Sequence, residues 1–230
     1  SFHVTGVQTC ALPILELDTR LDNRYLDLRR KHVNAIFNLR SKILQYGREH
    51  LISEGFKEIN SPKIIAAAAE GGTNLFPIKY FDRDAYLSQS PQLYKQLAVL
   101  GGLERVFEVG PAFRAEKHDT YRHLNEFVSF DIEMSWADDE DVMGVQERMI
   151  QHIWSNVAND DMNLIADINE FRSTQGLDDI TVEIPSIPFP RIEYSDAIEM
   201  IKAAGQDIVW GDDIEAHHAD IIAEKHPGFH

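Results

Sequence analysis

The sequence predicts an α+β protein in which a mainly antiparallel sheet is flanked by helices. Polar and apolar residues alternate over Arg105–Glu116 and again over Glu126–Met134. Such alternation is typical of strands, and the polar loop between the two segments predicts an antiparallel pair. Apolar residues recur at helical spacing over His32–Glu54, and Asp138–Asp141 places acidic residues at the start of another such segment. Helices are therefore expected beside a sheet built on one hairpin.

Composition and charge limit the class of protein. The 230 residues are 43% hydrophobic and 10% aromatic, as in a folded domain. There is no membrane-length apolar run and no secretory signal, so we expect a cytoplasmic protein. The single cysteine, Cys10, excludes an intrachain disulfide. A net charge of -16 gives no general attraction to nucleic acid, which would need a local patch or a further domain.

The first residues differ from the rest of the chain. Val4–Ile14 has neither a helical nor a strand period and resembles the in-frame translation of a sequencing-library adapter. We therefore expect residues 1–14 to be a non-native tail and exclude them from the fold prediction.

The segments between the long helix and the hairpin are shorter. The helix is expected to end near Gly55, with a short strand over Phe56–Asn60 and a loop over Ala66–Thr73. Tyr86–Ser88 is predicted to be a strand. Ser90 and Pro91 then predict a helix start, with Ser90 as the cap and Pro91 at the first helical position.

Gln92 and Lys95 share one face of the first turn of that helix, because they lie three residues apart. A lysine near a helix N-terminus opposes the helix dipole unless an anion lies there. The pair therefore predicts either a carboxylate site or a lysine extended into solvent.

Beyond the hairpin, Asp138–Asp141 is expected to cap a helix, residues 184–190 to be a connection, and Tyr194–Ala204 to be helical. Another possible helix carries His217, Asp220 and Glu224 on one face. Since no second group of ligands accompanies these three side chains, we expect a solvated face and no metal site.

The two strands of the hairpin each carry a polar face. On the first strand this face holds Glu108, Gly110, Ala112, Arg114 and Glu116; on the second it holds Phe127, Ser129, Asp131 and Glu133. If the faces coincide, an arginine suited to phosphate, an aromatic ring suited to a purine and acids suited to an amino group lie together. Alternation alone leaves a ligand site and a solvated sheet face equally open.

Four blocks carry a resemblance to a known family. Their sequences are LDTRLDNRYLDLRR (Leu17–Arg30), GFKEINSPKI (Gly55–Ile64), YLSQSPQLYKQ (Tyr86–Gln96), and FRAEKHDTYRHLNEF with VSFDIEM (Phe113–Met134). They resemble, in order, the link to an anticodon-binding domain, motif 1, the aspartate-specific segment and motif 2 of aspartyl-tRNA synthetases of the archaeal and eukaryotic type.

This resemblance implies a class II aminoacyl-tRNA synthetase catalytic core that is incomplete at the C-terminus. Residues 15–31 would be the linker from an anticodon-binding domain, and residues 32–230 a partial catalytic domain. No glycine-rich motif 3 is found before His230. We therefore expect the 230-residue chain itself to have negligible aminoacylation activity.

The resemblance also implies site residues. Arg114 would be catalytic, at the α-phosphate. ATP would be bound by Arg114, Glu116, Arg122, His123 and Phe127. Aspartate would be bound by Glu70, Gln92, Lys95 and Asp131. The tRNA acceptor end would face a loop of Lys117, His118, Asp119 and Thr120. Pro62 would lie at the dimer interface.

The implied activity is activation of aspartate with ATP to aspartyl-adenylate, followed by transfer to tRNA. The full-length enzyme would use Mg²⁺, with most of its ligands outside this chain, and would be a homodimer through motif 1. One alternative is an asparaginyl-tRNA synthetase, which Lys95 disfavours because a neutral amide gains nothing from a cation. Another is a tRNA-independent aspartate-adenylating paralogue, which the linker-like Leu17–Arg30 disfavours. A non-catalytic interaction module is disfavoured by the retained polar residues.

Overall fold

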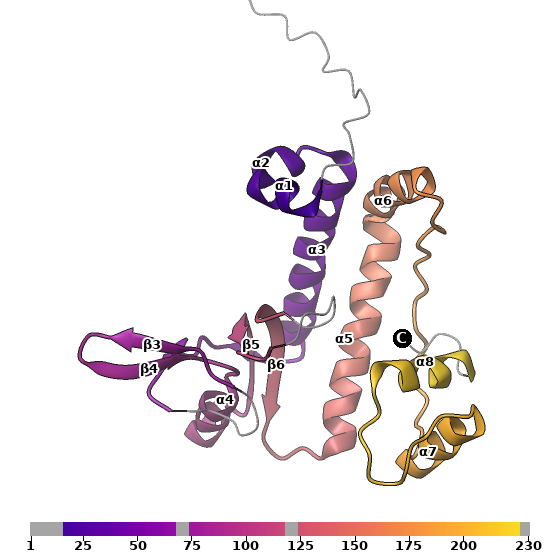
Figure 1. Cartoon of the computed structure of the whole chain (residues 1–230). Helices are drawn as coiled ribbons and strands as arrows, with labels where there is room; N and C mark the ends of the chain where they lie inside the picture. The colour runs from indigo at the N-terminus through magenta and orange to yellow at the C-terminus, as the bar shows by residue number, and fades with distance from the viewer. Residues whose placement is uncertain (1–15, 68–73, 118–123, 226–230) are drawn as a thin grey trace, which may run out of the picture. The chain divides into compact units, whose positions relative to one another are not determined.

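The computed structural model describes residues 16–67, 74–117 and 124–225 (Figure 1). Its helices are α1 Leu17–Asp22, α2 Arg24–Asp27, α3 Lys31–Ser53, α4 Gln92–Ala98, α5 Asp139–Asp160, α6 Met162–Thr174, α7 Tyr194–Ala203 and α8 Ala216–Lys225. Its strands are β1 Lys57–Glu58, β2 Ile64–Ile65, β3 Pro77–Tyr80, β4 Arg83–Leu87, β5 Arg105–Phe113 and β6 Glu126–Met134, and a π-helical turn, Val99–Leu103, continues α4. None of the described helices is long and apolar enough to cross a membrane.

The chain divides into two compact units. One comprises the described residues up to Ile43 together with Asn156–Val182, and the other comprises Leu44–Ser155 together with the described residues from Glu183 onward.

The first unit contains α1 and α2, which the sequence had suggested only as a linker. Asp27, the last residue of α2, is 5% exposed and is contacted by three arginines of this segment. Its carboxylate lies 3.1 Å from Arg20 Nε, 2.8 Å from Arg24 Nη1 and 3.3 Å from Arg30 Nη1. The hydrogen bond from Arg20 lowers the pKa of Asp27. A buried carboxylate with three guanidinium partners holds this short segment in one conformation.

The second unit is built on the sheet β1-β5-β6, in which β5 is parallel to β1 and antiparallel to β6. Phe107 pairs with Ile132, and Val109 pairs with Phe130. These side chains share one face of the sheet and pack with Leu51, from the C-terminal part of α3, and with other apolar residues of the core. The predicted alternation of both strands is therefore confirmed.

Gly47 is required where α3 meets this sheet. A Cβ atom at Gly47 would lie 2.7 Å from Phe130 Cζ, which is too close for a side chain of any size. The glycine therefore lets the Phe130 ring reach the helix backbone, at the cost of a weaker helix former inside α3.

A second sheet, β2-β4-β3, is antiparallel throughout. Its strand β4 begins three residues before the predicted Tyr86–Ser88 strand and ends at Leu87, whereas β2 and β3 were not predicted. The two sheets are joined through Ser88, whose N–H donates to the Lys63 carbonyl at 3.0 Å and whose carbonyl accepts from Phe113 N–H at 3.0 Å.

The helices at His32–Glu54 and Tyr194–Ala204 are confirmed as α3 and α7. In α3, Val33 and Leu51 are buried, but Ile36 is 47% and Phe37 40% exposed. The guanidinium of Arg24 lies 4.9 Å above the Phe37 ring, so a cation covers part of this aromatic surface.

The predicted cap of α4 is wrong by one residue. The helix begins at Gln92, and Pro91, whose φ of -83° and ψ of 10° are not helical, occupies the cap position. Lys95 N–H donates to the Pro91 carbonyl at 2.9 Å. Ser90 still accepts the Gln92 N–H through its Oγ, at 3.3 Å.

Two acidic residues at the start of α5 form a reciprocal cap, as predicted. Asp141 N–H donates to Asp138 Oδ1 at 3.0 Å, and Asp138 N–H donates to Asp141 Oδ2 at 3.2 Å. Each carboxylate therefore satisfies a backbone donor at a helix end, where negative charge is also favourable.

Stability should fall on acidification because of a group of charged residues between α3 and α5. Burial lowers the pKa of His50. Hydrogen bonds from Arg148, at 2.6 and 2.9 Å, lower the pKa of Glu54, which lies 3.1 Å from His50 Nε2. Both folded-state pKa values lie below the unfolded ones. The stability they contribute is therefore complete above the unfolded pKa and is lost as the pH falls.

We expect the free energy of unfolding to be constant from about pH 8 to pH 7 and to decrease below about pH 6.5, with a further decrease below about pH 4.3. Urea unfolding at each pH measures this. The variant His50→Gln should show a shallower loss between about pH 6.5 and pH 5. The comparison variant is His217→Gln, which removes an exposed histidine of α8. An identical profile for His50→Gln and the parent chain would contradict the assignment.

Candidate functional site

The polar faces of β5 and β6 coincide in the structure. Glu108 lies opposite Asp131, Gly110 opposite Ser129, and Ala112 opposite Phe127. The core pairs occupy the other face of the sheet. Small residues therefore lie beside charged and aromatic ones on a single surface, which we call the polar sheet face: Glu108, Gly110, Ala112, Phe127, Ser129, Asp131 and Glu133.

Lys95 reaches this face from α4. It is 8% exposed, so a lysine extended into solvent is excluded. Its Nζ lies 3.1 Å from Asp131 Oδ1 and 3.6 Å from Glu133 Oε2, and it donates to the Ile132 carbonyl at 3.2 Å. A buried ammonium therefore lies beside two carboxylates of β6 on the polar sheet face.

The two carboxylates beside Lys95 are held differently. Asp131 Oδ2 accepts a hydrogen bond of 2.7 Å from Ser129 Oγ, which fixes the carboxylate on the face. Among the described residues, the Glu133 carboxylate has one charged partner, Lys95, at the longer distance of 3.6 Å. Gln92, three residues before Lys95, is half-buried. Acceptors for an ammonium group and a cation for a carboxylate are therefore placed together, and these are the groups that bind an amino acid.

Phe127 lies at the end of the polar sheet face away from Lys95, and Arg114, which directly follows β5, lies beside it. The Arg114 guanidinium carbon lies 5.4 Å from the centre of the Phe127 ring. Arg114 Nε is buried and has no hydrogen-bond partner among the described residues. A buried guanidinium donor without an acceptor is costly, and a phosphate oxygen is a suitable acceptor for it.

The chain after β5 is held in place by Asn125. Its Nδ2 donates to the Arg114 carbonyl at 2.7 Å and to the Glu116 carbonyl at 2.9 Å, while Arg114 N–H donates back to the Asn125 carbonyl at 2.9 Å. These bonds position the backbone that carries Arg114, and Glu116 follows it half-buried.

The two ends of the face are separated by four residues of β6, from Phe127 to Asp131. At about 3.3 Å per residue this is roughly 13 Å. That distance allows an aromatic base and a phosphate at the end where Phe127 and Arg114 lie, and an amino acid at the end where Asp131 lies.

Other predicted residues lie elsewhere. Pro62 and Lys117 are exposed on the described chain. Outside the described residues lie Glu70, His118, Asp119, Thr120, Arg122 and His123.

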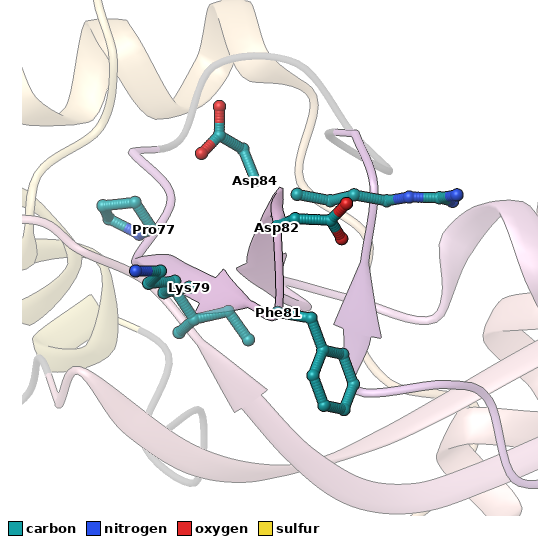
Figure 2. Close-up of a pocket in the computed structure, with 7 residues that line it drawn as sticks. Pro77, Lys79, Phe81, Asp82 and Asp84 are labelled. Atoms are coloured by element: carbon teal, nitrogen blue, oxygen red, sulfur yellow. The ribbon is translucent and has the colours of Figure 1, made fainter.

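The hairpin of β3 and β4 forms a pocket of its own (Figure 2). Its lining consists of Pro77, Ile78, Lys79, Phe81, Asp82, Arg83 and Asp84. None of the predicted site residues is among them, so this pocket does not belong to the polar sheet face. The part of the chain that the structure describes contains no group of three or more His, Cys, Asp and Glu side chains that could hold a metal.

The sequence places Glu108 on the polar sheet face but indicates neither a role for it nor its pairing with Lys63. Glu108 is 3% exposed and pairs with Lys63. The signal available was an acidic residue inside an otherwise small and apolar stretch of strand. Its partner lies 45 residues away in sequence, so alternation could not identify it.

Comparisons with known proteins point to one family. The model described as tRNA synthetases class II (D, K and N) matches residues 16–225. The aspartate–tRNA(Asp/Asn) ligase of Archaeoglobus fulgidus is 47% identical over 215 residues, which are 94% of this chain and 48% of that protein. The aspartate–tRNA(Asp) ligase of Thermoplasma volcanium is 46% identical over 224 residues, covering 95% of this chain and 50% of that protein.

A solved structure shows the same similarity. Asparaginyl-tRNA synthetase from Pyrococcus horikoshii, complexed with asparaginyl-adenylate, superposes with a TM-score of 0.79 at 34% identity. The match covers 92% of this chain and 47% of that one. The chain therefore spans about half the length of the relatives that it matches.

Proposed function

The chain belongs to the class II tRNA synthetases (D, K and N) and has the fold of their catalytic core, and from this we propose that it is the ATP- and aspartate-binding part of an aspartate–tRNA ligase. The observation that carries the proposal is the buried Lys95 beside Asp131 and Glu133. A buried ammonium suits the side-chain carboxylate of aspartate, and Asp131 suits its amino group.

The ATP part of the proposal rests on the other end of the polar sheet face. Arg114, whose buried Nε has no hydrogen-bond partner within the described part of the chain, would bind the α-phosphate, and Phe127 would stack on adenine. Glu116 follows Arg114 in the chain and would help to place ATP. Glu70, Arg122 and His123, together with the tRNA-facing loop of Lys117, His118, Asp119 and Thr120, complete the proposed site.

In the proposed reaction, an oxygen of the α-carboxylate of aspartate attacks the α-phosphorus of ATP. The new oxygen–phosphorus bond forms as the bond to the bridging oxygen breaks, and pyrophosphate leaves with that electron pair. A terminal ribose hydroxyl of tRNA then attacks the carbonyl carbon and releases its proton. The ester bond forms as the bond between that carbon and the phosphate oxygen breaks, and AMP leaves with the electron pair. No side-chain nucleophile is needed, so the residues of this chain act by positioning and charge stabilisation.

The remaining parts of the proposal come from the family. Its members use ATP together with Mg²⁺, and the described residues contain no group of three or more His, Cys, Asp and Glu side chains that could hold a metal. We also propose a cytoplasmic protein, a homodimer interface at the exposed Pro62, and a linker at residues 15–31 that leads from an anticodon-binding domain. Residues 1–14 remain, in this proposal, a non-native tail, and residues 32–230 form part of the catalytic domain.

Isothermal titration of the 230-residue chain with aspartate, asparagine and ATP tests the proposal. We expect ATP to bind, and aspartate to bind at least about tenfold more tightly than asparagine, because only aspartate brings a side-chain carboxylate to the Lys95 ammonium. Equal or tighter binding of asparagine would support an asparaginyl-tRNA synthetase instead. Binding of neither amino acid would contradict the proposed site.

A further inference from the structure

Glu108 is a buried carboxylate to which the proposed chemistry assigns no role. It is 3% exposed. Its Oε2 accepts a hydrogen bond of 2.9 Å from Ser61 N–H, and its Oε1 accepts one from the Lys63 ammonium. Lys63 Nζ also donates to Ser61 Oγ at 3.0 Å. The carboxylate therefore fastens the segment Ser61–Lys63 to the middle of β5.

The same carboxylate lies on the polar sheet face. Glu108 is directly opposite Asp131, and such cross-strand neighbours have Cβ atoms about 4.5–5.5 Å apart. A Cβ atom at Gly110 would lie 2.8 Å from Glu108 Oε1, so the carboxylate extends along β5 over that glycine. Two acids in this arrangement repel each other unless each has a cation.

Each of the two acids has its own lysine. Lys63 neutralises Glu108, and Lys95 lies 3.1 Å from Asp131. The two lysines come from different segments, and a backbone hydrogen bond joins the segment of Lys63 to the turn that precedes α4. Ser88 N–H donates to the Lys63 carbonyl at 3.0 Å, and Ser88 is buried in the turn that leads into α4, where Lys95 lies.

We propose that Lys63 and Glu108 are a positioning pair for the aspartate site. With Glu108 neutralised by Lys63, Lys95 and Asp131 keep the charges and positions that an aspartate molecule requires, although neither member of the pair touches it. Without Lys63, the buried charge of Glu108 faces Asp131 and draws the Lys95 ammonium from Asp131 toward Glu108. This inference rests on the proposed aspartate site.

The test compares Lys63→Met with the double variant Lys63→Met/Glu108→Gln, in which the uncompensated charge is also removed. For Lys63→Met we expect the Kd for aspartate to rise at least about tenfold, while the Kd for ATP stays within about twofold. The double variant should recover to within about threefold of the parent chain. Lys57→Met, which removes an exposed lysine of β1, is the matched control and should leave both constants unchanged.

Hydrogen exchange of the free chain supplies a readout that needs no ligand. Exchange over α4 and β6 should be faster in Lys63→Met, normal in the double variant, and unaffected over α7 in both. Unchanged aspartate binding in Lys63→Met would overturn the inference. So would a joint loss of aspartate and ATP binding that the double variant does not reverse, because that result indicates only a structural role.

The two proposals fail in different ways. If the parent chain binds no aspartate, the proposed function fails, and the exchange of α4 and β6 in Lys63→Met still decides whether the pair positions them. If the parent chain binds aspartate but exchange and affinity are unchanged in Lys63→Met, only the positioning role fails.

Discussion

Lys95→Met should weaken aspartate binding at least about 100-fold, which corresponds to about 2.7 kcal/mol. Lys95 is the buried cation of the site, 3.1 Å from Asp131 and 3.6 Å from Glu133. Methionine has a similar length but no charge, so the side-chain carboxylate of aspartate would meet two acids without a cation. Asparagine should be much less affected, so the preference for aspartate should be lost. Calorimetric titration with both amino acids measures this.

Two variants control this experiment. Lys79→Met removes an exposed lysine from β3 and should bind aspartate like the parent chain. Lys95→Arg keeps a cation against Asp131 and Glu133, so it should fold, but its planar group does not fit a site for an ammonium. We expect intermediate aspartate affinity for it. If folded Lys95→Met bound aspartate as tightly as the parent chain, Lys95 would not bind the ligand carboxylate, and the proposed function would lose its main support.

Phe107→Ala should lower the free energy of unfolding by about 3–5 kcal/mol, the range for removing a buried phenylalanine. Phe107 is 0% exposed and packs with Leu51 and Val109 beneath the polar sheet face. Stability is lost because less apolar surface is buried on folding. It is also lost because the substitution leaves a cavity that the close-packed neighbouring side chains fill only partly. Because whole domains are stable by only about 5–15 kcal/mol, the second unit should be partly unfolded at moderate temperature.

Phe81→Ala is the matched control, since it removes the same side chain from the hairpin tip, where Phe81 is 81% exposed. It should change stability by no more than about 0.5 kcal/mol. Urea unfolding followed by circular dichroism compares the two variants. Equal stability of Phe107→Ala and Phe81→Ala would show that the β5–β6 face does not form the core.

Much of the site was accessible from sequence because it lies on regular strands. The two-residue period of a strand decides which side chains share a face, so Phe127 and Asp131 could be grouped before any contact was known. The helix start near Ser90 likewise put Gln92 and Lys95 on one side. The error of one residue at this cap has a local cause: Pro91 has a backbone conformation outside the helical range, which residue types alone do not reveal.

The helices and strands that the sequence did not predict are short, or they are stabilised by contacts with residues outside the element itself. The strand β3 has four residues and gains its partner only by pairing with β4. The helices α1 and α2 are six and four residues long, too short to be stable alone, and they close around Asp27 and its arginines. Their formation depends on interactions that no local pattern contains.

By itself, the sequence determined the α+β class, the two faces of the β5–β6 hairpin and the chemical character of its polar face. Local periodicity and residue type are sufficient for these features. Only the tertiary structure decided that Lys95 is buried against Asp131, that Lys63 neutralises Glu108, and that Gly47 admits the Phe130 ring. These contacts join residues far apart in the chain, and their geometry depends on how whole elements pack.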